Sequence, residues 1–321
     1  MIVLWRVTTR CNLACSFCAY DRRLGFPRTL VDPAEVERFG ALLGAYRADS
    51  GEDILISWLG GEPLLWPGVL ALSQRLRNEH GLRISVTTNG TTLLRPGIAR
   101  AVAETFDEVT ISVDALAQTH ERLRGWSGGW TKLAEGIDRL STMTGAQASP
   151  LIRANVVLMR DTLSEFSVLC DRLADWGVKE ITFNQLGGRD RPEFYSDHAL
   201  RPDDAIRLRM TLPSLAARMA KRGVRLCAND SYLERIEATA AGRPIPVLNC
   251  GPRRPTVFID EHNRIACCSF TQDGYSVPTH TVRTVSDIAA LRARLDAGRL
   301  ANLPAVCSDC PSTQVFAKFG T

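Results

Sequence analysis

Residues 2–18 read IVLWRVTTRCNLACSFC, so a strand-like run leads directly into three closely spaced cysteines. β-Branched and aromatic side chains dominate residues 2–9, and such side chains favour a strand. Five more strand-like segments follow along the chain, at 54–60, 83–89, 108–114, 152–159 and 180–186. Each ends near a Gly, Asn, Asp or Cys residue, so polar or Gly-rich turns follow the strands.

Helical patterns separate these strands. One begins at Asp32, a residue type that caps helices, with Pro33 at the first helical position. Another ends at Gly177, which is typical of helix C-termini. Strict alternation of strand and helix predicts parallel strands joined by right-handed crossovers. A dinucleotide-binding fold would carry a G-x-G-x-x-G motif directly after its first strand, and in this chain cysteines occupy that position. We therefore predict an α/β fold, a partial (β/α)6 TIM-like barrel with its chemistry at the strand ends.

The pattern changes after residue 187. A long polar connection comes first, followed by a helix at about 203–221 and a short strand at 224–227. A second group of cysteines occupies the last part of the chain. We expect three regions, namely the barrel at 1–187, a connecting helical segment at 188–245, and a small C-terminal domain at 246–321.

Composition narrows the class of protein. Of the 321 residues, 45% are hydrophobic and the formal net charge is only +4, which is typical of a globular protein and not of a polyanion binder. No apolar run approaches the roughly 20 residues of a membrane helix, and the N-terminus lacks a secretory signal. We expect a cytoplasmic protein without nucleic-acid or membrane partners. Ten cysteines in such a compartment indicate metal or redox chemistry, with Cys170 and Cys227 as core residues.

Cys11, Cys15 and Cys18 form a compact C-x-x-x-C-x-x-C motif. Three thiolates at this spacing can ligate three irons of one [4Fe–4S] cubane and leave the fourth iron open to an amine and a carboxylate. A zinc site is the alternative, although zinc usually needs a fourth ligand, and no other Cys or His lies close by in sequence.

The segment CNLACSFC resembles the signature of the radical S-adenosylmethionine (SAM) superfamily, and the resemblance covers roughly residues 2–187. Three further motifs follow in family order, namely GGEP at 60–63, TTNG at 87–90 and SVD at 112–114. In the family, the GGEP segment holds the amino group of SAM, for which a Gly-Gly turn offers carbonyl oxygens beside a carboxylate. The resemblance implies SAM contacts by Phe17, Tyr20, Gly60, Gly61, Glu62, Pro63, Asn89, Ser112, Asp114 and Arg153.

Two of these assignments have alternatives. Ser112 and Asp114 lie on one face by strand alternation, where they would meet the ribose hydroxyls or the carboxylate of SAM, or else act as structural caps. Arg153 resembles a family residue that often pairs with the SAM carboxylate, a contact that suits a guanidinium.

The C-terminal cysteines resemble the twitch/SPASM auxiliary-cluster domains of the same superfamily. Ile259, Asp260 and Ile265 fit the family hairpin, and Asn263 stands in place of its turn glycine. The resemblance implies a second [4Fe–4S] cluster in the shorter, twitch form, with zinc as the alternative metal. The implied ligands are Cys250, Cys268, Cys307 and Cys310.

Cys267 is then surplus. It either replaces Cys268 as a ligand, packs in the core, or acts catalytically by returning a hydrogen atom to a substrate radical.

The resemblance implies an enzyme with two [4Fe–4S] clusters and SAM, reduced by a partner such as flavodoxin or ferredoxin. Reductive cleavage of SAM would yield a 5′-deoxyadenosyl radical that abstracts hydrogen from a substrate carbon. We expect epimerisation or dehydrogenation of a small natural product of the aminoglycoside or sugar type, because the cluster motif begins at residue 11 and leaves no room for a peptide-leader domain. The alternative is modification of a peptide or protein by an epimerase, a thioether-forming maturase or an oxidising maturase. A non-catalytic metal scaffold and an RNA-modifying enzyme are disfavoured.

Overall fold

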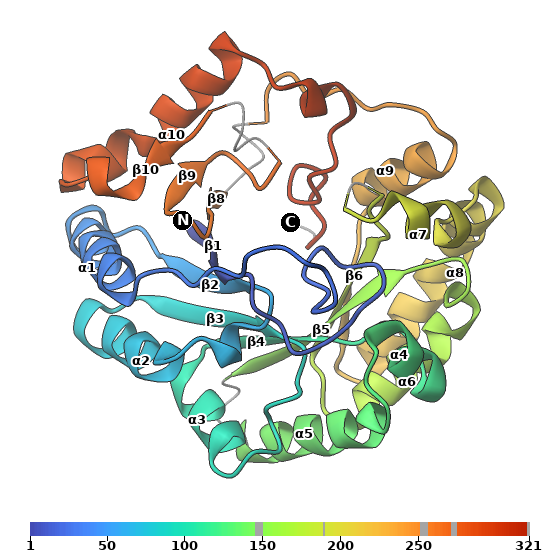
Figure 1. Ribbon diagram of the computed structural model, residues 1–321. Coiled ribbons are helices and arrows are strands. Elements are labelled where there is room, and N and C mark those ends of the chain that lie inside the picture. Colours follow the sequence, from blue (N-terminus) through green and yellow to red (C-terminus); the bar gives the residue numbers. More distant parts are fainter. Residues whose placement is uncertain (145–149, 189, 251–255, 271–274, 320–321) are drawn as a thin grey trace.

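A curved, mainly parallel sheet forms the centre of the molecule. The computed structural model describes residues 1–144, 150–188, 190–250, 256–270 and 275–319. Neighbouring strands in chain order pair in parallel along most of this sheet (Figure 1). They are β1 (Ile2–Thr8), β2 (Leu55–Gly60), β3 (Arg83–Thr88), β4 (Glu108–Ser112), β5 (Leu151–Leu158), β6 (Glu180–Gln185) and β7 (Arg225–Cys227).

Helices cover the outside of the curved sheet (Figure 1). The predicted α/β fold class is confirmed, because the chain folds as an open barrel of parallel strands wrapped by helices. The helices are α1 (Pro33–Ser50), α2 (Val69–His80), α3 (Ile98–Thr105), α4 (Ala117–Arg124), α5 (Gly129–Thr144), α6 (Phe166–Asp175), α7 (Pro192–His198), α8 (Pro202–Lys221), α9 (Asp230–Ala240) and α10 (Val285–Ala301).

Local sequence explains the first helix and the core beneath it. The Asp32 side chain accepts a hydrogen bond from the Ala34 amide at 3.1 Å, as expected of an N-cap. Trp5, Phe39 and Trp58 are fully buried between β1, β2 and α1, where the rings of Trp5 and Phe39 meet edge to face with centroids 5.7 Å apart.

The C-terminal region joins the same sheet. Strand β8 (Thr256–Ile259) pairs in parallel with β1 on the side away from β2, and β9 (Arg264–Ala266) and β10 (Val277–Pro278) follow in antiparallel pairing. The third expected region, 246–321, therefore extends the barrel sheet at its first strand. The division of the chain into three regions stays a prediction.

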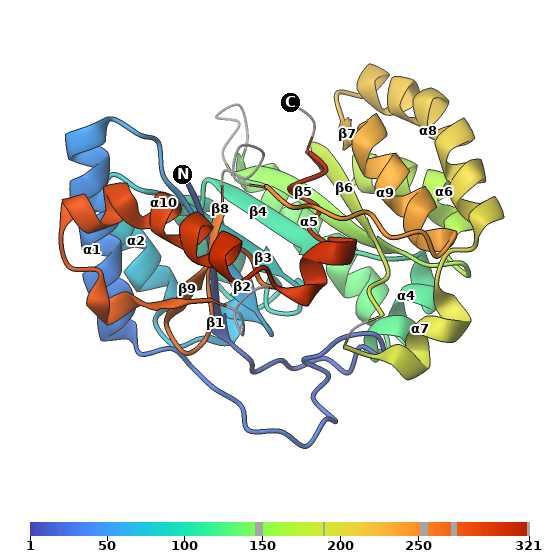
Figure 2. The same ribbon diagram turned by 90° about the horizontal axis from the view of Figure 1, so that it is seen from above.

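Four of the described helices, α4, α7, α9 and α10, were not predicted from the sequence. Helix α7 lies within the segment that we expected to be a polar connection, and α4 follows the SVD motif. In Figure 2 the long loop between β1 and α1 lies on one side of the sheet, and the N-terminal end of the chain lies on the other. The carboxyl ends of the strands and their following loops therefore share one face.

None of the described helices is long and apolar enough to cross a membrane.

Candidate functional site

The three N-terminal cysteines lie together in the loop between β1 and α1, at the carboxyl-end face of the sheet. Burial raises the pKa of the Cys15 thiol to about 12, and the nearby Cys18 and Cys11 thiols add to this shift. Burial likewise raises the pKa of Cys11 and of Cys18. Thiolate is the form that binds metal, so a bound cationic centre is what would offset the cost of charging these buried thiols.

Backbone contacts fix the shape of this loop. The Leu13 amide donates to the sulfur of Cys11 at 3.5 Å, and the Tyr20 amide donates to the sulfur of Cys18 at 3.4 Å. The Cys15 thiol donates to the Arg124 carbonyl oxygen at 3.8 Å, at the C-terminal end of α4. The cysteine loop is thereby docked on a helix that the sequence did not reveal.

The Gly60–Gly61 turn packs directly against the cysteine loop. The Gly61 amide donates to the Thr8 carbonyl and the Glu62 amide donates to the Arg10 carbonyl, both at 2.8 Å. A Cβ atom on Gly60 would lie 2.1 Å from the Thr8 oxygen, and one on Gly61 would lie 2.1 Å from the Arg10 oxygen. Gly60 also has a φ of 137°, which side chains disfavour. Both glycines are therefore required for the close approach of the two segments.

We predict that Gly61→Ala destabilises the apoprotein by about 1–3 kcal/mol, because the added methyl group displaces the backbone of the cysteine loop. Urea unfolding would measure this change. Gly25→Ala is the matched control, because it lies in the same loop with nothing within 4 Å of its Cβ position. The control should change stability by no more than about 0.5 kcal/mol. Equal effects of the two substitutions would contradict the proposed packing.

Glu62 ties the GGEP turn to the TTNG segment. Its carboxylate accepts hydrogen bonds from the Thr88 hydroxyl at 2.7 Å, the Asn89 amide at 2.7 Å and the Leu64 amide at 3.1 Å. The side chain is completely buried, and burial raises its pKa to about 7. Pro63 follows at the start of a short 3-10 helix. The carboxylate thus positions the two motifs relative to each other.

Asn89 contacts the cysteine loop directly. Its amide nitrogen Nδ2 lies 3.7 Å from the Cys11 sulfur and 3.0 Å from Asn12 Oδ1, as a donor to both. The ends of β2 and β3 therefore converge on the first cysteine, in agreement with the order of the sequence motifs.

Asp114 and Arg124 form a buried ion pair beneath the cysteines. Arg124 Nε and Asp114 Oδ2 are 2.6 Å apart, and Asp114 Oδ1 accepts from the Val157 amide at 2.9 Å. Both carboxylate oxygens are thus bonded within the protein, which favours the structural-cap role of Asp114 over a ribose contact. The Arg124 guanidinium lies 5.5 Å from the Phe17 ring centre and lowers the pKa of the Cys15 and Cys18 thiols against the opposing effect of burial.

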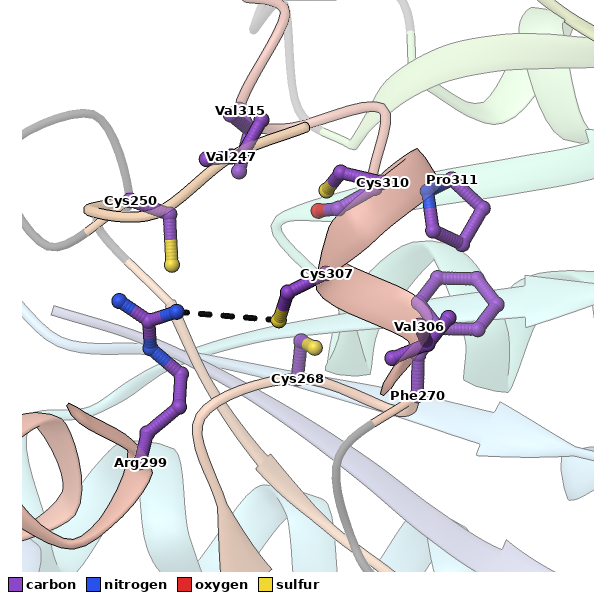
Figure 3. A pocket seen from close by; sticks show the side chains of 11 residues that line it. Val247, Cys250, Cys268, Phe270, Arg299, Val306, Cys307, Cys310, Pro311 and Val315 are labelled. Atoms are coloured by element: carbon purple, nitrogen blue, oxygen red, sulfur yellow. Dashed lines mark hydrogen bonds between the residues drawn. The ribbon is translucent and has the colours of Figure 1, made fainter. Parts of the chain in front are cut away.

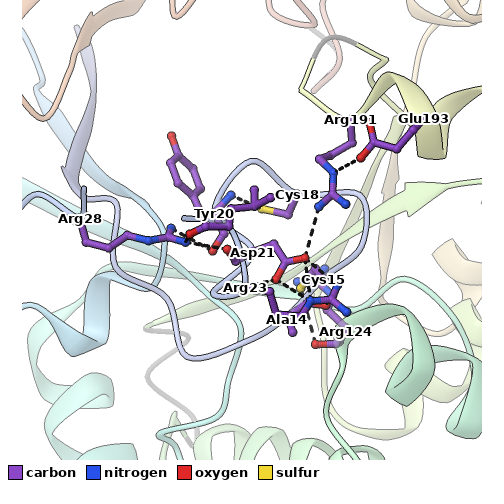
Figure 4. A network of polar contacts seen from close by, with 11 residues as sticks. Ala14, Cys15, Cys18, Tyr20, Asp21, Arg23, Arg28, Arg124, Arg191 and Glu193 are labelled. Carbon is purple, nitrogen blue, oxygen red and sulfur yellow. Dashed lines mark hydrogen bonds and ion pairs between the residues drawn. The ribbon is translucent and has the colours of Figure 1, made fainter. Parts of the chain in front are cut away.

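A second polar network holds the outer part of the loop (Figure 4). Asp21 Oδ2 accepts from Arg23 at 2.6 Å and from Arg191 at 3.2 Å, and the hydrogen bond from Arg23 lowers the pKa of Asp21 to about 2. Arg191 precedes α7, so the connecting segment is anchored to the cysteine loop. Tyr20 is nearby, with its ring centre 5.7 Å from the Arg6 guanidinium carbon.

Two other predicted SAM contacts differ in position. Ser112 is half-buried at the carboxyl end of β4 and lies on the face of the cysteine loop. Arg153 does not join this group. It is near the amino end of β5, and it forms ion pairs with Glu108 at 3.1 Å and Glu180 at 2.6 Å. We therefore withdraw Arg153 from the proposed SAM contacts.

The C-terminal cysteines surround a single cavity (Figure 3). Cys250, Cys268, Cys307 and Cys310 all line it. Burial raises the pKa of Cys310 to about 11, and the other three thiols add to this shift. Arg299 is only 1% exposed and donates to the Cys307 sulfur at 3.7 Å. A buried cation thus stands in the wall of a cavity ringed by thiols.

Cys267 points elsewhere. Its thiol donates to Asp296 Oδ1 at 3.6 Å, and it is not among the described residues that line the auxiliary cavity or the barrel interior. This geometry favours Cys268 over Cys267 as the ligand.

The barrel interior contains a cavity of about 880 Å³. Its walls come from alternate residues of the parallel strands and from the C-terminal segment 313–319. The uncharged polar residues that the strands β2 to β6 contribute are Ser57, Ser85, Thr87, Thr110, Asn155, Thr182 and Asn184. Charged residues line the cavity as well, namely Glu52, Asp53, Arg83, Glu108, Arg153, Arg225 and Lys318. A partly open chamber with mixed polar and apolar walls therefore lies on the inner side of the sheet.

Comparison with known proteins identifies the family. The model of the Radical SAM superfamily matches residues 5–173, which span β1 to α6 and include the cysteine loop. The chain belongs to the radical SAM superfamily. Radical SAM proteins use SAM and a [4Fe–4S] cluster. The loop offers one buried thiol, Cys15, and two half-buried thiols, Cys11 and Cys18, beside the GGEP and TTNG segments, and thiols are the ligands that such a cluster needs.

Relatives in the superfamily differ widely in named activity. The pre-heme d1 synthase of Dinoroseobacter shibae is 29% identical over 210 residues, which cover 62% of this chain and 47% of that protein. The GTP 3′,8-cyclase 1 of Pseudomonas aeruginosa is 30% identical over 206 residues, covering 61% of this chain and 59% of the cyclase. The aligned part thus spans about half the length of these relatives.

Two solved structures share the fold along nearly the whole chain. SuiB of Streptococcus suis, bound to S-adenosylmethionine, matches with a TM-score of 0.67 and 14% identity over 97% of this chain and 72% of SuiB. The protein anSMEcpe, with bound AdoMet, matches with a TM-score of 0.68 and 14% identity over 98% of this chain and 88% of anSMEcpe. At this identity the likeness concerns the fold alone.

Proposed function

We propose that this radical SAM enzyme acts on a small, polar substrate within the barrel and that the net reaction is an epimerisation or a dehydrogenation. The observation that supports this proposal is the cavity of about 880 Å³ on the inner side of the sheet, whose walls combine apolar side chains with hydroxyl, amide and charged groups. Small-molecule sites in proteins commonly measure roughly 300–1,000 Å³, so the chamber suits a sugar-sized or aminoglycoside-type molecule together with part of SAM.

Cys11, Cys15 and Cys18 are the proposed ligands of the cluster that contacts SAM. When bound, the reduced cluster and SAM supply a 5′-deoxyadenosyl radical for hydrogen abstraction. Asn89 donates to the Cys11 sulfur, and Arg124 brings positive charge beside Cys15 and Cys18. Both groups favour thiolates at buried positions.

The remaining SAM contacts are proposed at the strand ends on this face. The Gly60–Gly61 turn and Ser112 offer polar groups there, and Phe17 and Tyr20 flank the third cysteine. The barrel wall would keep solvent from the reacting carbon. Electrons for the reduction would come from a small carrier protein such as flavodoxin or ferredoxin, in the cytoplasm.

A second [4Fe–4S] cluster is proposed at Cys250, Cys268, Cys307 and Cys310. Within the described ranges, no three Cys, His, Asp or Glu side chains converge closely enough to hold one metal ion, yet four thiols ring one cavity. Four cysteine ligands suit either a [4Fe–4S] cluster or a zinc ion, and the resemblance to auxiliary-cluster domains favours the cluster. The buried Arg299 guanidinium would offset the negative charge of such a cluster.

Modification of a peptide is the second candidate function. SuiB has been crystallised with its precursor peptide SuiA, and anSMEcpe with a peptide called Cp18Cys. The barrel cavity is partly open, so a peptide side chain or terminus could enter it. Cys267 is part of neither proposal, because its thiol bonds to Asp296 outside the barrel chamber.

Transfer of a substrate hydrogen to 5′-deoxyadenosine can distinguish the two candidate functions, even when the substrate is not known. Cells that make the protein are grown in deuterated medium, and their small-molecule and peptide fractions are each added to reduced protein with unlabelled SAM. We expect deuterium in 5′-deoxyadenosine from the small-molecule fraction only. Deuterium from the peptide fraction alone would support the second candidate and contradict the first.

A further inference from the structure

Lys318 brings an amino group into the barrel interior from the C-terminal end of the chain. Its Nζ donates to Asn155 Oδ1 on β5 and to Asn184 Oδ1 on β6, both at 2.8 Å. The residue is 5% exposed and lines the barrel cavity. Figure 1 shows the last described residues of the C-terminal segment within the ring of strands. Family resemblance does not explain this residue, because it lies outside the matched range 5–173.

The charge of Lys318 is not balanced by a carboxylate in the described part of the chain. Its two acceptors are neutral amides. Two carboxylates on neighbouring strands, Glu108 and Glu180, are paired with arginines: Arg153 binds both of them, and Arg225 also binds Glu180. Burial, together with the nearby Arg153 charge, lowers the pKa of Lys318 to about 7. A buried ammonium without an anionic partner is costly, and burial of that kind is found mainly at functional sites.

The geometry leaves room for one further contact. An ammonium group has three N–H donors, and two of them are directed to Asn155 and Asn184. Asn155 pairs in register with Ser112, the last residue of β4, so it sits close to the face of the cysteine loop. A ligand bound at Nζ would therefore lie in the chamber between the C-terminal segment and the proposed SAM site.

We propose that Lys318 binds a carboxylate group of the substrate and holds the substrate in the barrel. This inference rests on the proposed function, because the same chamber receives the radical chemistry. A carboxylate matches the site in charge, since it carries one negative charge opposite one ammonium. A phosphate group carries about −1.5 to −2 charge at neutral pH, more than one lysine balances while the neighbouring arginines are paired.

The competing explanation is structural. The ring centre of Phe319 lies 5.4 Å from Nζ, and the carbonyl oxygen of Phe319 accepts a hydrogen bond from Arg225 at 2.9 Å. Lys318 would then only fasten the C-terminal segment to the barrel wall. That role predicts loss of stability on mutation, but no preference for anionic ligands.

Ligand binding to the full-length protein distinguishes these roles. The probes are N-acetylglycine with its neutral amide, N-acetylglycinamide, and glucuronate with glucuronamide, all at constant ionic strength. Calorimetry at pH 6.5 should show that the wild type binds at least one carboxylate about tenfold or more tightly than its amide. A preference for N-acetylglycine would indicate a peptide-like substrate, and one for glucuronate a sugar acid.

Lys318→Gln and Lys318→Met should both abolish this preference, and Lys318→Arg should retain it. Lys221→Gln is the matched control, because Lys221 is exposed on α8. The proposal is overturned if the wild type shows no preference in either pair, or if a folded neutral variant keeps it. These measurements require no SAM cleavage. A protein that binds carboxylates through Lys318 but forms no 5′-deoxyadenosine would therefore overturn the proposed function alone.

Discussion

Cys15→Ala is expected to abolish the formation of 5′-deoxyadenosine from SAM. Cys15 is the middle ligand of the proposed N-terminal cluster, and it is buried against the Arg124 carbonyl where no replacement ligand is at hand among the described residues. Loss of one ligand of three leaves the cluster too weakly held to survive. The iron content of the variant should be lower than that of the wild type by about four atoms per chain, because only the iron of the auxiliary cluster remains. Iron analysis and product assay of the anaerobically reconstituted protein would measure both changes.

Cys170→Ala is the matched control for this experiment. Cys170 is also a buried thiol, but it lies on α6, packs in the apolar core and has no part in either cysteine cluster. We expect the control to keep its full iron content and its activity. Activity in the Cys15 variant, or an equal loss in both variants, would contradict the assignment of the N-terminal ligands.

Cys268→Ala should remove the auxiliary cluster, and Cys267→Ala should not. The two residues are adjacent in sequence, yet only Cys268 lines the cavity formed with Cys250, Cys307 and Cys310. The Cys268 variant should lose about four iron atoms per chain and keep its capacity to cleave SAM at the N-terminal cluster. Iron and zinc analysis of the two variants, with visible absorption spectra, would test this expectation.

The opposite pattern of iron loss would show that Cys267 is the ligand. Zinc in place of iron in the anaerobically purified wild type would show that the site is a zinc site. A Cys267→Ala variant that keeps all its iron, as expected, but changes the stereochemistry of the product would support the hypothesis that Cys267 donates a hydrogen atom.

Much of the barrel could be predicted because the sequence patterns that indicate its strands and turns each lie within a few consecutive residues. Each strand of the first half is a β-branched run followed by a polar turn, and such a run specifies a strand without knowledge of its partners. The motifs stand at strand ends, so the topology of a parallel sheet brings them together. Helix α4 was missed because its sequence, AQTHERLR, lacks a continuous apolar stripe.

Other features depend on contacts between residues distant in sequence. The pairing of β8 with β1 joins segments more than 250 residues apart, and no local pattern encodes it. Arg124 and Lys318 are buried charges whose partners come from other elements, so their sequence context gave no signal. Arg124 depends on its ion pair with Asp114, and Lys318 depends on side-chain amides of β5 and β6.

The position of Arg153 argues against a SAM contact for a reason that the sequence contained. Arg153 is the third residue of β5, and the chemistry of a parallel barrel gathers at the opposite, carboxyl end of its strands. The prediction followed the resemblance to a family arginine and did not take into account that Arg153 lies near the start of its strand. The structure instead gives Arg153 two carboxylate partners near the amino end of the sheet.

Cleavage of SAM by the wild-type protein tests the whole account most directly. The protein is reconstituted with iron and sulfide, reduced with dithionite and incubated with SAM, and the products are quantified by chromatography. We predict formation of 5′-deoxyadenosine and methionine in equal amounts, with no product from the unreduced protein. A fully loaded N-terminal cluster that yields no 5′-deoxyadenosine under these conditions would contradict the account.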